Sequence, residues 1–163
     1  MRTNNSKVKN TIISVYFILI VLAIVFAVVF NLFSDLTLNS TVTFVVISCV
    51  FVLLFFLVHY ISKFFEYDSD GIKVVVTNSG LLLSDNFNYR EKILEFKKSD
   101  LYAYKFKNYL ILRTLTFFVK DGRDKKRNET FNITLMSRKK RRYIRQSLSK
   151  MVKLNKNSQS INE

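Results

Sequence analysis

The sequence predicts a membrane α-helical hairpin of two transmembrane helices, followed by a mainly-β domain of about seven antiparallel strands and a C-terminal amphipathic helix. Three observations lead to this fold class. Two long, uncharged apolar runs come first, and short alternating runs separated by turn residues follow them. The last segment repeats apolar residues at the spacing of a helix that covers a core.

Charge is concentrated in the second part of the chain. The 163 residues carry 26 basic and 12 acidic side chains, a formal net charge of +14. Only Arg2, Lys7, Lys9 and the acidic Asp35 precede residue 63. A chain that is apolar first and basic afterwards fits neither a soluble enzyme nor a disordered protein. We therefore expect an integral membrane protein with a basic domain outside the bilayer.

Residues 11–33 and 41–62 each carry no Asp, Glu, Lys or Arg. At ~1.5 Å of rise per residue, a helix of either length crosses the ~30 Å hydrocarbon layer. The first run is too long for a signal peptide and has no small-residue cleavage site after it. Residues 34–40 join the runs and contain no basic residue, whereas residues 1–10 are basic. The positive-inside rule then places both termini in the cytoplasm and the 34–40 loop outside.

Ala23 and Ala27 are the candidate residues for close helix packing. Two small side chains four positions apart let another helix approach, either the second span or a second copy of the chain in a homo-oligomer. Packing within the hairpin is the favoured functional interpretation, and two alanines in an apolar run need no function at all. No ionisable group lies at membrane depth, so we expect no transport by this chain alone.

The region from 64 to 154 is expected to form one domain of strands closed by a helix. Turn residues and alternation predict strands at 64–68, 72–77, 81–84, 89–96, 101–107, 110–120 and 131–135. Ser137 is a good N-cap for a helix over 138–154 that packs through Ile144, Leu148 and Met151. The polar residues 155–163 are expected to be a disordered tail.

Aromatic and basic residues alternate in "LYAYKFKNYL", residues 101–110. Single-stranded nucleic acids stack on such aromatics, but the stronger interpretation places Tyr102, Tyr104 and Phe106 on the core face of a strand. Lys105 and Lys107 would then lie in water. We therefore expect this strand to belong to the core rather than to bind nucleic acid.

The order of these elements resembles the pleckstrin-homology-like (PH-like) fold. The segments "FNYREKILEF", "KNYLILRTLTFFVK" and "FNITLMSRKK" are similar to bacterial, Bacteroidota-type two-span membrane proteins with a cytoplasmic PH-like domain. The resemblance implies an inner-membrane location and a fold rather than an activity. The first strand turn is "TNSG", with Lys73 the nearest cation, so the basic inositol-lipid motif of eukaryotic PH domains does not carry over.

No group of residues has the spacing of a catalytic, cofactor or metal site. His59 is the single histidine and ends the second apolar run, and Cys49 is the single cysteine. The three glycines are isolated turn residues, which does not match a phosphate-cradling loop. "DSDG", residues 68–71, is better explained as a hairpin turn than as a Ca²⁺ loop. We expect a protein without catalytic activity, cofactor or metal.

Two basic segments remain as candidate binding residues. They are Lys125, Lys126 and Arg127, and then Arg138, Lys139, Lys140, Arg141 and Arg142. Three interpretations stay open: a solvated face, contact with anionic lipid head groups, or contact with an acidic protein or nucleic acid. Lipid is favoured over the last because the span ends near residue 62 and the first strand begins near 64. The function expected is a membrane-anchored binding or scaffolding module, and the alternative is an accessory subunit of a larger membrane complex.

Overall fold

The computed structural model describes residues 1–33, 39–80, 91–120 and 126–160. The chain forms two compact units. The helical hairpin comprises Val8–Ser62, and the β domain joins Met1–Lys7 to Lys63–Glu163. The hairpin is therefore an insertion in the sequence of the β domain, not a segment that precedes it.

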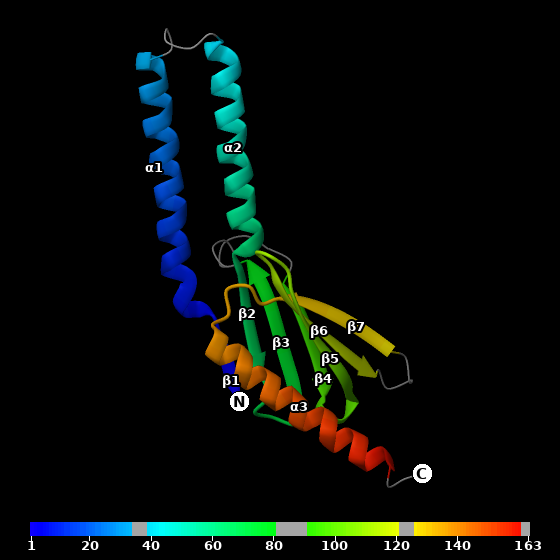
Figure 1. Cartoon of the computed structure of the whole chain (residues 1–163). Coiled ribbons are helices and arrows are strands. Elements are labelled where there is room, and N and C mark those ends of the chain that lie inside the picture. Colours follow the sequence, from blue (N-terminus) through cyan, green and yellow to red (C-terminus); the bar gives the residue numbers. More distant parts are fainter. Residues whose placement is uncertain (34–38, 81–90, 121–125, 161–163) are drawn as a thin grey trace. The chain divides into compact units, whose positions relative to one another are not determined.

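Helices α1 (Lys9–Phe33) and α2 (Ser40–Ile61) form the hairpin, close to the predicted spans (Figure 1). Both helices are long and apolar enough to cross a membrane. Aromatic rings join them along one face: Tyr16 meets Phe55 with 4.9 Å between ring centroids, and Phe26 stacks on Phe44 at 6.0 Å. The opposite faces consist of exposed apolar side chains.

The β domain contains two antiparallel sheets and a helix (Figure 1). The first sheet has the order β1 (Arg2–Asn4), β2 (Lys63–Asp68), β3 (Lys73–Gly80), β4 (Lys92–Lys97), and the second has the order β5 (Leu101–Asn108), β6 (Arg113–Lys120), β7 (Lys126–Asn132). Two 3₁₀ turns, η1 (Ser6–Val8) and η3 (Lys98–Asp100), and helix α3 (Arg138–Ser160) complete the described elements.

Strand β1 lies within residues 1–10, for which the sequence predicts only a basic N-terminus. Arg2 pairs with Asp68 and Asn4 with Glu66, which makes β1 an edge strand beside β2. The Met1 amino group forms an ion pair with Asp70. Asn5 is 2% exposed and its amide binds the β2 backbone. A domain that begins at residue 64 would therefore lack one strand.

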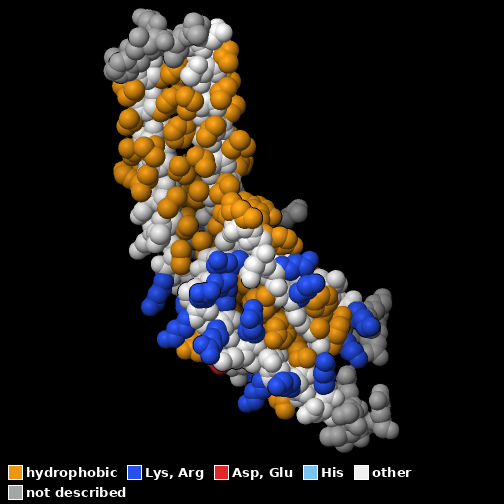
Figure 2. Space-filling view, in the orientation of Figure 1, with side chains coloured by type: hydrophobic (Ala, Val, Ile, Leu, Met, Phe, Trp, Pro, Cys, Tyr) orange, Lys and Arg blue, Asp and Glu red, His pale blue; other side chains and the backbone are white. Residues whose placement is uncertain are grey.

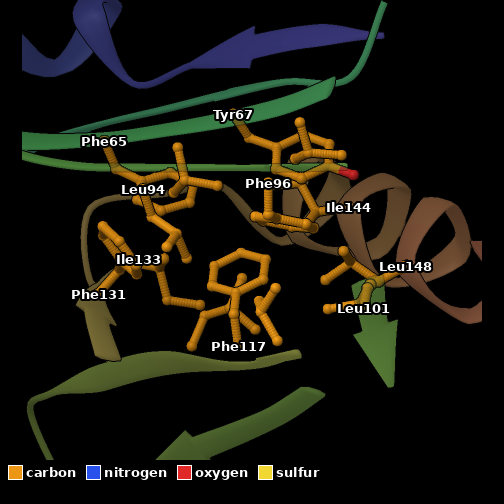
Figure 3. Packing of buried hydrophobic residues seen from close by; sticks show 14 of the residues in the cluster. Phe65, Tyr67, Leu94, Phe96, Leu101, Phe117, Phe131, Ile133, Ile144 and Leu148 are labelled. Carbon is orange, nitrogen blue, oxygen red and sulfur yellow. The ribbon is translucent and has the colours of Figure 1, made fainter. Parts of the chain in front are cut away.

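The hydrophobic core lies between the two sheets and is covered by α3. Phe65, Tyr67, Leu94 and Phe96 come from the first sheet, and Leu101, Phe117 and Phe131 come from the second (Figure 3). Ile144 and Leu148 of α3 are fully buried against them, and Met151 is partly buried, as predicted. Burial of these side chains supplies the main stabilisation of the domain.

Several strand boundaries differ from the prediction. Asn78, Ser79 and Gly80 continue β3 instead of forming a turn, because they pair with β2. Residues 109–112 form the tight β5–β6 connection rather than the start of a strand, and Tyr109 N donates to Leu112 O over 2.7 Å. Strand β7 covers Lys126–Asn132, earlier than the predicted 131–135. The predicted strand 81–84 lies outside the described residues.

A β-bulge corrects the prediction for the aromatics of β5. The register to β6 shifts between Leu101 and Ala103, which turns the following residues over relative to Leu101. Tyr104 and Phe106 consequently pack on the core, whereas Tyr102 pairs with Phe118 at 6.1 Å between ring centroids. The prediction that all three aromatics share the core face was wrong for Tyr102.

Helix α3 extends to Ser160, so 155–160 are helical rather than part of a disordered tail. Asn155 explains part of this extension. Its side-chain amide donates to Lys98 O over 2.7 Å and to Leu101 O over 2.8 Å. These hydrogen bonds hold the last turns of α3 against the start of β5. The polar composition of residues 155–163 does not indicate such contacts.

Candidate anion-binding site

Five arginines line a cavity of about 560 Å³ at one end of the β domain, and we call it the arginine pocket. Its lining consists of Arg113, Arg138, Arg141, Arg142 and Arg145, with Phe106, Asn108 and Tyr109. Figure 2 shows Lys and Arg side chains across the visible face of the β domain, with almost no acidic side chains among them.

Helix α3 supplies four of the five arginines because of their spacing. Positions 138, 141, 142 and 145 follow an i, i+3, i+4, i+7 pattern, which places their side chains on one side of a helix. Ile144 and Leu148 are buried on the neighbouring side and anchor the helix. Ser137 starts α3, where its Oγ accepts from Lys140 N over 3.4 Å and its carbonyl accepts from Arg141 N over 3.0 Å.

Arg113 enters the pocket from the first residue of β6. Its backbone N donates to Thr134 Oγ1 over 3.0 Å, and its carbonyl accepts from Ile133 N over 2.8 Å. These contacts tie the start of β6 to the chain that leads into α3. A residue distant in sequence is thereby brought to the N-terminal turns of α3.

The pocket has a strongly positive local charge that no carboxylate among the described residues neutralises. Among the described residues, none of the five arginines forms an ion pair with a carboxylate. Arg141 Nε is buried without a hydrogen-bond partner. The pKa of Arg141 lies below its ordinary value, first because of burial and then because of Arg113, Arg138 and Arg145. Burial and the neighbouring arginines therefore make the charged form of Arg141 less favourable in the folded chain than in water.

Guanidinium groups in this arrangement are suited to phosphate. Each presents a rigid fork of N–H donors that binds phosphate oxygens in pairs. The side chain of Arg145 also lies over the ring of Phe106, at 4.9 Å from its centroid, which limits where its donors can reach. Among the described residues, no cluster of three metal-ligating side chains accompanies the pocket.

The structure divides the predicted basic residues into separate groups. Arg138, Arg141 and Arg142 line the pocket, whereas Lys139 is exposed outside it. Lys140 Nζ donates to the carbonyl of Asn4, the last residue of β1. Lys126 and Arg127 lie on β7, where Lys126 covers the Tyr102 ring at 6.0 Å and Arg127 Nε binds Glu129 Oε1 at 3.0 Å. Lys125 lies outside the described residues.

Sequence reasoning missed Arg113 and Arg145. The helical spacing of the α3 arginines was visible in the sequence and indicates Arg145. No signal in the sequence pointed to Arg113, because its place in the pocket depends on the β6 contacts with 133–134.

Both ends of the hairpin insertion leave the β domain at the end that carries the pocket. Asn78 Nδ2 donates to Phe64 O over 2.9 Å and to Asn132 O over 3.0 Å, and Asn132 pairs with Thr114, next to Arg113. Asn5 contacts Lys63 O over 2.9 Å at the same end. Asn5 and Phe64, which belong to the β domain and lie close in sequence to the hairpin, are therefore at the end of the β domain that carries the pocket.

Ala23 and Ala27 are half-buried and lie on the face of α1 that carries Phe26 and Phe30. Those two rings contact Phe44 of α2, so the alanines face the inside of the hairpin. Cys49 is an exposed free cysteine on α2, and His59 is exposed in its last turn.

Comparisons with protein-family models, with curated proteins and with solved structures found no match to the chain.

Proposed function

We propose that this protein is a membrane-anchored, non-catalytic PH-like binding module whose arginine pocket holds the phosphate of anionic lipid head groups. The proposal rests on the cluster of five arginines, none of which forms an ion pair with a carboxylate in the described part of the chain. A phosphate would offset the repulsion among these side chains and would give Arg141 Nε an acceptor. No protein group among the described residues offers the same compensation.

The helical hairpin supports membrane anchoring. Its outward faces consist of large exposed apolar side chains, such as Phe17, Leu53 and Phe56, each about two thirds exposed. Water would penalise this surface, whereas lipid accommodates it. The anionic surface of a cytoplasmic leaflet also contributes about 1 kcal/mol per nearby basic residue, which favours a bacterial inner membrane as the location.

Strand pairing supports the proposed topology. Strand β1 precedes the hairpin and β2 follows it, and the two strands are neighbours in one sheet. Both ends of the hairpin must then lie on the same side of the membrane. Four strands in one sheet, three in the other and a C-terminal helix also agree with a PH-like fold, here with the hairpin inserted after the first strand.

Lipids retained by the full chain in mild detergent test the binding function. We expect mass spectrometry to find phosphatidylglycerol or cardiolipin with the native protein. A variant with Arg113, Arg138, Arg141 and Arg145 changed to Gln should retain at least about tenfold less, because several charge-assisted hydrogen bonds are lost. The matched control changes the exposed Lys97, Lys105, Lys107 and Lys156 to Gln. Equal loss in both variants would contradict a specific pocket.

The alternative function is an accessory subunit of a larger membrane complex. It is favoured by a groove of about 480 Å³ on α2, lined by Phe44, Val45, Ser48, Cys49, Val52 and Leu53. The small side chains of Ser48 and Cys49 in this groove let a further helix approach. The same purification tests this function: a protein that stays bound to the arginine variant but leaves a Ser48→Phe variant would favour the subunit over the lipid-binding module.

A further inference from the structure

The connection between β5 and β6 has an amino-acid composition that is unusual for a tight turn. Its residues 109–112 read Tyr-Leu-Ile-Leu, with none of the Gly, Asn, Asp or Pro that such turns prefer. Leu110 is fully exposed, and Tyr109 and Ile111 are each about half exposed. We call these three residues the apolar tip. The turn thus lacks its preferred residues, and the exposed apolar side chains in their place add no burial to the core. Such a departure is typical of a functional surface.

Basic side chains stand directly behind the apolar tip. Tyr109 lines the arginine pocket, and Arg113 follows the turn by two residues and lines the same pocket. An apolar protrusion with arginines behind it suits a bilayer surface. The apolar side chains can reach the hydrocarbon while the arginines remain at the level of the anionic head groups. Tyr109 adds an aromatic ring with a polar end, the type of side chain that favours the membrane interface.

The apolar tip also lies at the end of the β domain that is tied to the apolar helices. Arg113, at the base of the tip, connects through 132–133 to Asn78 and from there to Phe64, immediately after α2. Helix α2 ends at Ile61 and β2 begins at Lys63, so Ser62 alone separates the two elements. A contact made by this end with a bilayer is effectively intramolecular, and even a small apolar area is then sufficient.

We propose that the apolar tip inserts into the bilayer interface and forms a second, apolar membrane contact beside the arginine pocket. This inference rests on the proposed membrane anchoring, but it does not require phosphate in the pocket. The tip would set the orientation of the β domain, with the pocket opening toward the head groups. A protein partner or a second copy is less suited to a narrow protrusion than to a groove or flat face.

Tryptophan fluorescence tests the insertion directly, because the chain contains no tryptophan. A Leu110→Trp variant of the full chain is reconstituted in nanodiscs of phosphatidylcholine, alone or with phosphatidylglycerol. We expect emission shifted to shorter wavelength, strong quenching by brominated lipid, and several-fold weaker quenching by aqueous iodide than in the control. The control is Ile72→Trp, which places the same side chain at another exposed apolar position, in the β2–β3 turn.

Each outcome decides the proposal. Quenching by brominated lipid at position 110 but not at 72, in either lipid composition, supports insertion. Quenching by iodide at both positions overturns it, and so does an indole at position 110 that is shielded from both quenchers, since a protein would then cover the tip. The lipid retained by the arginine variant is a separate measurement. Lipid binding by the pocket can therefore be disproved while insertion of the tip is supported, and insertion can be disproved while lipid binding is supported. An Ile111→Trp variant repeats the test if Leu110→Trp misfolds.

Discussion

Asn5 and Phe65 are joined by two hydrogen bonds although they are 60 residues apart. Phe65 N donates to Asn5 Oδ1 over 2.9 Å, and Asn5 N donates to Phe65 O over 3.2 Å. The Asn5 side chain also donates to Lys63 O. One buried amide therefore fastens the chain before the hairpin to the chain after it.

Replacement of Asn5 by Ala should lower the free energy of unfolding of the β domain by about 2–3 kcal/mol. The change leaves Phe65 N and Lys63 O without their partners in a buried position. Hydrogen exchange of the β2 and β3 amides in the full chain measures the effect. The control is Asn4→Ala, because the Asn4 side chain makes only exposed bonds to Ser6. Similar effects of both changes would contradict the role assigned to Asn5.

Reporter fusions should give an in-out-in topology. A reporter after Glu163 is expected to be active only in the cytoplasm, and one inserted in 34–40 only outside. The segregation of basic residues predicts the side, and the β1–β2 pairing requires an even number of crossings. Opposite locations for the two ends of the hairpin would be incompatible with this sheet.

Replacement of Leu148 by Asp should destabilise the β domain by more than about 4 kcal/mol. Leu148 is fully buried between α3 and the sheets, where a carboxylate finds no partner. Leu154→Asp is the matched control on the same helix, since Leu154 is 57% exposed, and its effect should be below about 1 kcal/mol. A Leu148→Asp variant with native hydrogen-exchange protection would show that α3 does not belong to the core.

Replacement of Arg141 by Met should stabilise the anion-free β domain by about 0.5 kcal/mol at low ionic strength. The pKa of Arg141 is lowered by burial and by neighbouring arginines, so its charged form is less favoured in the folded than in the unfolded chain. Methionine keeps an apolar stem of similar reach. The gain should shrink as salt screens the pocket. Arg127→Met, which removes an arginine paired with Glu129, should give no gain.

The free energy of unfolding of the β domain should decrease when the pH is lowered and Glu129 becomes protonated. Hydrogen bonding from Lys92 holds the pKa of Glu129 below its ordinary value, with Arg127 adding to this and burial opposing it. A lowered carboxyl pKa contributes stability that is present above the unfolded-state pKa and is lost as pH falls through the folded-state pKa. Glu129→Gln should cost about 0.5–1 kcal/mol at neutral pH and nothing in strong acid. A cost independent of pH would indicate lost packing instead.

The sequence alone determined the two apolar helices, the strand-rich second part and the amphipathic character of α3. These features depend on continuous runs or on periodicity within a segment, and such patterns are local. For the same reason Ile144, Leu148 and Met151 were correctly placed toward the core. The basic residues of α3 were also identified, although not as members of one cavity.

Only the tertiary structure decided where distant segments meet. Residues 2–4 carry no strand pattern of their own and become β1 because β2 offers an unpaired edge and Asn5 is buried beside it. A one-residue bulge sends Tyr102 to the opposite face from Tyr104. Arg113 reaches the α3 arginines through backbone contacts with 133–134, and the apolar 109–112 segment becomes a turn because β5 and β6 pair on either side of it. Each of these outcomes rests on how one segment pairs with another, whether a neighbouring strand or a distant one, and the periodicity within a single segment does not encode that pairing.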